Sequence, residues 1–144
     1  MGEPVALAIH KHDRWCVVGK ITAFEGDTTP ILAVAWKGQH GTTAAISMPA
    51  VALDYARQRG VKWFFLRDDR ARRMWALPLA AFWRGRLHAD GEYYVPRHWL
   101  EEVPWRDWHY AERTVRLERP PAMATPVAQP DAGAVQLQMF EVAA

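Results

Sequence analysis

The chain has 144 residues, of which half are apolar and 24% are charged, and its formal net charge is +2. This length suits one domain with a tail, and the composition excludes a wholly disordered or fibrous protein. No apolar run approaches the roughly 18–20 residues of a membrane span, and no secretory signal is visible at the N-terminus, so we expect a cytoplasmic protein without a membrane partner. The single cysteine, Cys16, excludes an internal disulfide and a Cys-based zinc site.

The first third of the chain has the pattern of β-strands. Short apolar runs rich in β-branched and aromatic residues alternate with turn-forming segments, and a turn-rich connection at 25–30 separates the second run from the third. The predicted strands are 5–9, 15–21 and 31–36, with a further short edge strand at 42–48.

One helix is predicted at 49–59, where the spacing of apolar residues becomes helical. Pro49 occupies a first-turn position, Ser47 is a candidate cap, and Gly60 follows the last helical residue.

The second half returns to strands. Residues 61–66 and 73–79 predict an antiparallel pair around a turn at 68–70, with Pro78 marking an edge or the end of pairing. A strand at 92–95 and one or two helical turns at 96–102 follow, whereas 105–117 is compatible with strand or helix. This order predicts an α+β fold: a single small domain, residues 1–119, with a mixed β-sheet and one main helix.

The composition changes at residue 120. Residues 120–144 contain no Lys or Arg and four prolines, which leaves 18 basic and 14 acidic residues in 1–119 and a net charge of +4 there. A stretch that is so rich in proline and so weakly apolar predicts a flexible, disordered tail. The mild basicity of the domain permits nucleic-acid binding without requiring it.

The tail ends close to a specific motif, Gln136-Leu137-Gln138-Met139-Phe140. This motif resembles the sliding-clamp-binding motif of bacterial replication and repair proteins, Gln-Leu-x-Leu-Phe, with Met in place of the commoner Leu. The resemblance implies that the bacterial sliding clamp is a partner and that Gln136, Leu137, Met139 and Phe140 bind it. In this mode apolar side chains enter pockets and the Gln amide supplies directional hydrogen bonds.

Aromatic and basic residues alternate in the second half of the domain, which has most of the eight tryptophans. Such interleaving supplies base stacking and phosphate neutralisation, the two requirements for binding single-stranded or branched DNA. For any single tryptophan, however, packing in the core is the commoner role. The predicted DNA-binding residues are Arg67, Arg70, Arg72, Arg73, Arg84, Arg86, Arg97, Trp99, Arg106 and Trp108.

An enzyme is the alternative. The run 17–79 resembles in outline the PD-(D/E)xK nucleases, including archaeal-type Holliday-junction resolvases, which implies Mg²⁺-dependent cleavage. Asp27 then corresponds to the first acid and Lys37 to the motif lysine, with Glu25 as a second acid from the loop. The sequence departs from the family at Ala35, where an acid is required to hold the metal.

These observations predict a bacterial or phage DNA replication or repair accessory protein, cytoplasmic and associated with the nucleoid. Its core binds DNA, its tail binds the sliding clamp, and no cofactor is needed. A clamp-tethered nuclease using Mg²⁺ and a clamp-occupying regulator that binds no DNA are the two alternatives.

Overall fold

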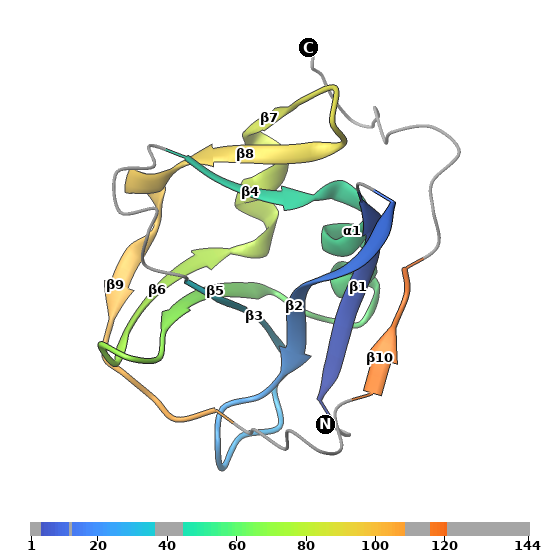
Figure 1. The fold of residues 1–144 in the computed structure, drawn as a ribbon. Helices are drawn as coiled ribbons and strands as arrows, with labels where there is room; N and C mark the ends of the chain where they lie inside the picture. The colour runs from blue at the N-terminus through green and yellow to red at the C-terminus, as the bar shows by residue number, and fades with distance from the viewer. Residues whose placement is uncertain (1–3, 12, 37–44, 109–115, 121–144) are drawn as a thin grey trace.

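The computed structural model describes residues 4–11, 13–36, 45–108 and 116–120, and Figure 1 shows their arrangement. Seven strands form a large mixed sheet in the order β10-β1-β2-β3-β5-β6-β9. The pairs β1–β10 and β3–β5 are parallel, and the remaining neighbours are antiparallel. The strands are β1 (Val5–Lys11), β2 (Arg14–Thr22), β3 (Ile31–Ala35), β5 (Trp63–Asp68), β6 (Arg73–Pro78), β9 (Glu101–Val103) and β10 (Arg116–Glu118).

A second, smaller sheet has the order β4-β8-β7 and is antiparallel throughout. Its strands are β4 (Ala45–Pro49), β7 (Arg86–Leu87) and β8 (Glu92–Pro96). The one α-helix, α1 (Ala50–Gln58), and two 3₁₀ helices, η1 (Leu79–Arg84) and η2 (Arg97–Trp99), complete the described elements.

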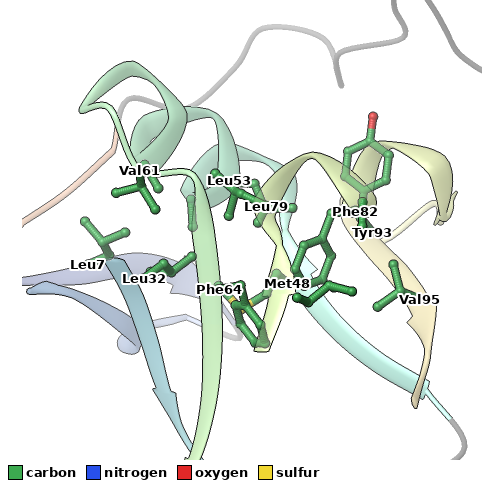
Figure 2. Packing of buried hydrophobic residues seen from close by; sticks show 14 of the residues in the cluster. Leu7, Leu32, Met48, Leu53, Val61, Phe64, Leu79, Phe82, Tyr93 and Val95 are labelled. Atoms are coloured by element: carbon green, nitrogen blue, oxygen red, sulfur yellow. The ribbon is translucent and has the colours of Figure 1, made fainter. Parts of the chain in front are cut away.

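The main core lies between the large sheet, α1 and the small sheet. Figure 2 shows Leu7, Leu32 and Phe64 of the large sheet directed toward Leu53 of α1 and Val95 of β8. All five side chains are fully buried. A second cluster, built on Phe24, Ile31, Ala33 and Met74, covers the opposite face of the large sheet, and Trp105 and Trp108 pack against it.

The predicted fold class is confirmed: the protein is α+β, with a mixed sheet and one main helix. Most predicted elements are present, but the cap at Ser47 is wrong. Ser47 lies inside β4, and Pro49 occupies the N-cap position without a side-chain hydrogen bond. Instead the Ala50 amide donates to the Gly91 carbonyl. The predicted tail lies outside the described residues from 121 onward.

The structure also assigns the segments 96–102 and 105–117, which contain only short elements. Of 96–102, only η2 is helical, and β9 follows it. Of 105–117, Trp108 forms an isolated bridge with Phe24, and β10 begins at residue 116.

β2 and β3 are paired over only part of their length. A bulge in the β1–β2 ladder places Val18 between the pairs Leu7–Gly19 and Ala8–Val17. A bulge increases local twist, so β2 turns away from β3 at this point. The described register between them comprises three pairs and stops at Lys20 and Ala33, and Figure 1 shows the two strands diverging.

Candidate functional site

A buried arginine organises the face of the large sheet that lies opposite α1. The Arg67 side chain has no exposed surface, and its guanidinium carbon lies 4.3 Å from the ring centres of both Trp105 and Trp108. Arg72 lies 5.1 Å from the Trp105 ring centre and Lys20 lies 5.6 Å from that of Trp108. Cations and indoles therefore alternate along these contacts, and we call these five residues the Arg67 stack.

The polar contacts of Arg67 are incomplete. One terminal nitrogen donates to the Arg106 carbonyl at 3.1 Å and the other contacts Met74 Sδ at 3.7 Å. Its Nε lies 3.5 Å from Asp69 Oδ1, an ion-pair distance, but makes no hydrogen bond. Burial lowers the pKa of this guanidinium, and Asp69 partly opposes the shift. Arg67 was predicted to bind DNA. Its burial corrects that prediction, because no phosphate can reach the side chain in this structure.

A second arginine–tryptophan cluster lies on the other face, against the main core. The Arg97 guanidinium lies 3.7 Å from the Trp36 ring centre and 5.1 Å from that of Trp75, and the two indoles are in contact. Arg73 also lies over Trp75 and donates two hydrogen bonds to Glu102, at 2.9 and 2.8 Å. The predicted DNA-binding residues are thus divided between two faces rather than assembled into one surface.

Ion pairing divides the remaining arginines of the predicted set. Arg72, Arg73 and Arg106 pair with Asp107, Glu102 and Asp27, respectively. Within the described residues, no ion pair is formed by the other four, which are Arg70, Arg84, Arg86 and Arg97. Trp99 is 36% exposed, and Trp108 is half-buried in the Arg67 stack.

One of these four arginines, Arg86, lies on the outer side of the small sheet, and Arg84 is close to it in the sequence. Arg86 is directly opposite Tyr94 in the β7–β8 register, and Ser47 is opposite Tyr94 on β4. Directly opposed residues share one face of a sheet. The His88 ring contacts the Tyr94 ring, with centres 4.0 Å apart and planes inclined by 43°, and Arg84 lies at the end of η1, two residues before Arg86. We call Arg84, Arg86, His88 and Tyr94 the small-sheet face.

Sequence reasoning did not place His88 and Tyr94 in the DNA-binding set. The alternation of side chains along β8 could have identified Tyr94, because buried Tyr93 and Val95 point to one side of the strand and half-buried Tyr94 points to the other. The nearest carboxylate, that of Asp90, accepts a hydrogen bond from the Tyr94 hydroxyl at 3.0 Å, which raises the pKa of the phenol.

The residues of the predicted nuclease site lie around an exposed turn. Asp27 Oδ1 accepts the amides of Thr28 and Thr29, at 2.7 and 3.1 Å, and Oδ2 lies 3.7 Å from Arg106. These contacts lower the pKa of Asp27, the Thr29 amide contributing most. Glu25 is exposed, and Lys37 lies outside the described residues. In the part of the chain that the structure describes, no three His, Cys, Asp or Glu residues form a group that could hold a metal ion.

A groove of about 880 Å³ opens where β2 and β3 diverge. Its floor includes Val17 and Gly19 of β2 and Val34 and Ala35 of β3. Trp105 and Trp108 line one side, and the charged side chains around it are Lys20, Arg72, Glu25, Asp69 and Asp107. The feature of the sequence that could have indicated this groove is Gly19, because a glycine inside an apolar strand marks a bulge or the close approach of another backbone.

The clamp-binding residues Gln136, Leu137, Met139 and Phe140 all lie outside the described residues. The described helices include none long and apolar enough to cross a membrane. Comparisons with protein-family models, with curated proteins and with solved structures found no match.

Proposed function

We propose that this protein is a DNA replication or repair accessory factor that binds single-stranded DNA through its small-sheet face and the bacterial sliding clamp through residues 136–140. The observation that carries the DNA-binding proposal is that exposed Arg86, which is in no ion pair among the described residues, lies directly opposite Tyr94, whose ring contacts that of His88. Rings on an exposed sheet face stack with bases, and neighbouring guanidinium groups neutralise phosphates.

The balance of charge favours this face over the Arg67 stack. Two carboxylates act on Tyr94 at this face: Asp90 accepts the hydrogen bond of its hydroxyl, and Glu92 is ion-paired with Lys11. The Arg67 stack instead adjoins Asp69 and Asp107, and its other two cations, half-buried Lys20 and exposed Arg72, are engaged with its indoles. A polyanion gains more from cations that are not already neutralised.

Asp27 supports the accessory role over the nuclease alternative. Its carboxylate caps its own turn and pairs with Arg106, which is a structural role that needs no metal.

DNA binding is tested by anisotropy of a labelled single-stranded oligonucleotide at low salt. The double variant Arg84→Ala/Arg86→Ala should weaken binding about a hundredfold or more, because charge-assisted hydrogen bonds contribute roughly 1.5–3 kcal/mol each. Arg57→Ala/Arg59→Ala removes the same charge from α1, where both arginines are in ion pairs, and should change the affinity little. Equal effects of the two double variants would contradict the proposed face. No binding by the wild-type protein would leave the clamp-occupying regulator as the function.

Clamp binding is tested separately by capture on an immobilised bacterial clamp. Replacing Gln136, Leu137 and Phe140 with alanine should abolish capture, since a buried aromatic anchor contributes about 2–4 kcal/mol at an interface. Gln138→Ala changes the tolerant position of the motif and should leave capture intact. Undiminished capture of the triple variant would overturn this part of the proposal.

A further inference from the structure

The groove between β2 and β3 has the properties of a site for an extended peptide. Beyond Lys20 and Ala33, the described register has no further pair between these strands. Each strand keeps a neighbour on its other side, β1 for β2 and β5 for β3. Since backbone groups point alternately to the two sides of a strand, those of Val17–Gly19 and Val34–Ala35 that face the groove have no described strand beside them.

Gly19 sets the point at which the groove begins. A Cβ atom at this position would lie 3.1 Å from Val34 Cγ2 and 3.3 Å from the Ala33 carbonyl oxygen, so β3 still approaches the β2 backbone closely beside the last paired row. Past Gly19 the bulge turns β2 away, and Val17 is left 57% exposed. A strand entering this opening would obtain backbone partners and an apolar floor together, as in β-strand addition.

The charges at the groove select against nucleic acid as the occupant. Three carboxylates and two cations line it, and two of the carboxylates are paired with Arg67 and Arg72, so the groove offers a polyanion no surplus of positive charge. Tail residues 132–140 carry no charge. Within them Val135, Leu137 and Met139 alternate with Gln136 and Gln138, which is the period of a strand with one apolar face.

The described end of the chain directs the tail to this groove. Glu118, the last residue of β10, is paired with Leu7, and Leu7 is paired with Gly19. These three residues form one row across the sheet, so β10 ends about 10 Å, two strand spacings, from the start of the groove. Arg119 then lies 4.7 Å from the ring centre of Trp15, which projects from β2 on the same side as Val17.

We propose that residues 135–139 of the protein's own tail dock in the groove between β2 and β3 as an added strand. The 14 residues from 121 to 134 span roughly 20 Å as a coil, which exceeds the distance required. Docking buries Leu137 and Met139, the side chains that the clamp would take. If the proposed clamp-binding function holds, the groove and the clamp compete for the same segment. The clamp motif is then covered by the groove in the free protein and becomes available only when it leaves the groove.

The test uses ¹H–¹⁵N spectra of the full chain. Leu137→Asp/Met139→Asp should shift the amide signals of Val17, Gly19 and Ala35 and the indole signals of Trp105 and Trp108, whereas Gln138→Ala should leave them in place. These shifts should be independent of protein concentration over about a tenfold range. Unmoved groove signals would overturn the docking, and a concentration-dependent shift would assign the groove to the tail of a second copy. Groove signals that respond to single-stranded DNA and not to the tail variant would also overturn it.

Clamp affinity supplies the second measurement. Val17→Glu places a charge on the floor at an exposed position and should raise the affinity roughly three- to tenfold, as expected if the tail is docked for about 70–90% of the time. Val17→Thr keeps the shape of the side chain and should leave the affinity unchanged. An unchanged affinity in Val17→Glu would overturn the competition. Groove signals that shift in Leu137→Asp/Met139→Asp while clamp capture persists would retain the docking and refute the clamp proposal.

Discussion

Arg67 and Arg70 show how differently two arginines three residues apart can be used. Arg70 is exposed in the β5–β6 turn, whereas Arg67 is buried between two indoles from residues 105 and 108. Strand alternation places Arg67 on the same face of β5 as Phe65, which packs in the second cluster. The cover over that face comes from a segment about forty residues further along the chain, so the burial of Arg67 is a tertiary property.

Arg67→Ala should lower the free energy of unfolding by about 3 kcal/mol, because it removes cation–π contacts with Trp105, Trp108 and Phe24 and leaves a cavity. Arg67→Met should be less damaging, since a flexible apolar chain fills the space and removes a buried charge whose Nε has no hydrogen bond. Urea denaturation measures both. Arg70→Ala is the control, expected within about 0.5 kcal/mol of wild type. A loss below about 1 kcal/mol for Arg67→Ala would show that the indoles pack equally well without it.

Asp27 makes the stability of the folded protein depend on pH, and the direction of its pKa shift gives the sign of that dependence. Its pKa in the folded protein lies below the ordinary value of 3.8, chiefly because the Thr29 and Thr28 amides donate to the charged carboxylate. A lowered pKa contributes stability that is present above the unfolded value and is lost as the pH falls through the folded value. The Thr28 and Thr29 amide signals should therefore titrate together with Asp27 below pH 3.8. Asp27→Asn should abolish this titration, and a midpoint above that pH would contradict the contacts.

At the scale of elements, Gly85 determines how closely η1 approaches β8. A Cβ there would lie 2.3 Å from the Tyr94 carbonyl oxygen and 2.8 Å from Val95 Cγ1, and both neighbours belong to a paired strand. This close approach is next to the Arg86–Tyr94 pair, so it supports the small-sheet face directly.

Gly85→Ala should destabilise the protein by about 2–4 kcal/mol, since β8 backbone must move to admit the methyl group. It should also weaken DNA binding if the small-sheet face is the site. Gly26→Ala is a matched control at an open turn, where the positive φ of 80° alone costs about 1 kcal/mol. Thermal unfolding distinguishes them, and equal losses in the two variants would contradict the close approach at Gly85.

The elements that the sequence predicted well are those whose signal is local. The 15–21 and 31–36 strands, the 49–59 helix and the hairpin around 68–70 are all present, because alternation, a first-turn proline and turn residues act within a few positions. The parallel pairing of β10 with β1 and the pairing of β4 with β8 depend on contacts between segments about 40 to 110 residues apart. No local pattern encodes these pairings, and the two clusters and the groove follow from them.

At the scale of the whole molecule, tryptophan and arginine are used mainly for internal contacts. A guanidinium lies over each of the rings of Trp36, Trp75, Trp105 and Trp108, and four of the predicted DNA-binding arginines are in ion pairs. Interleaved aromatic and basic residues in the sequence therefore do not translate into one continuous stacking surface. The number of cations available to DNA is much smaller than the domain's composition indicates.

The small number of cations available to DNA determines the expected salt dependence of DNA binding. For single strands, the logarithm of the affinity falls with the logarithm of salt concentration by about 0.7 for each phosphate neutralised. Arg84→Ala/Arg86→Ala should reduce the slope by about 1.4, because both cations lie beside the stacking rings of the small-sheet face. Tyr94→Leu, in contrast, should weaken binding with the slope unchanged, since it removes stacking and no charge. Anisotropy titrations over a salt series measure both slopes, and a slope that is reduced by Tyr94→Leu but not by the arginine variant would move the DNA-binding surface elsewhere.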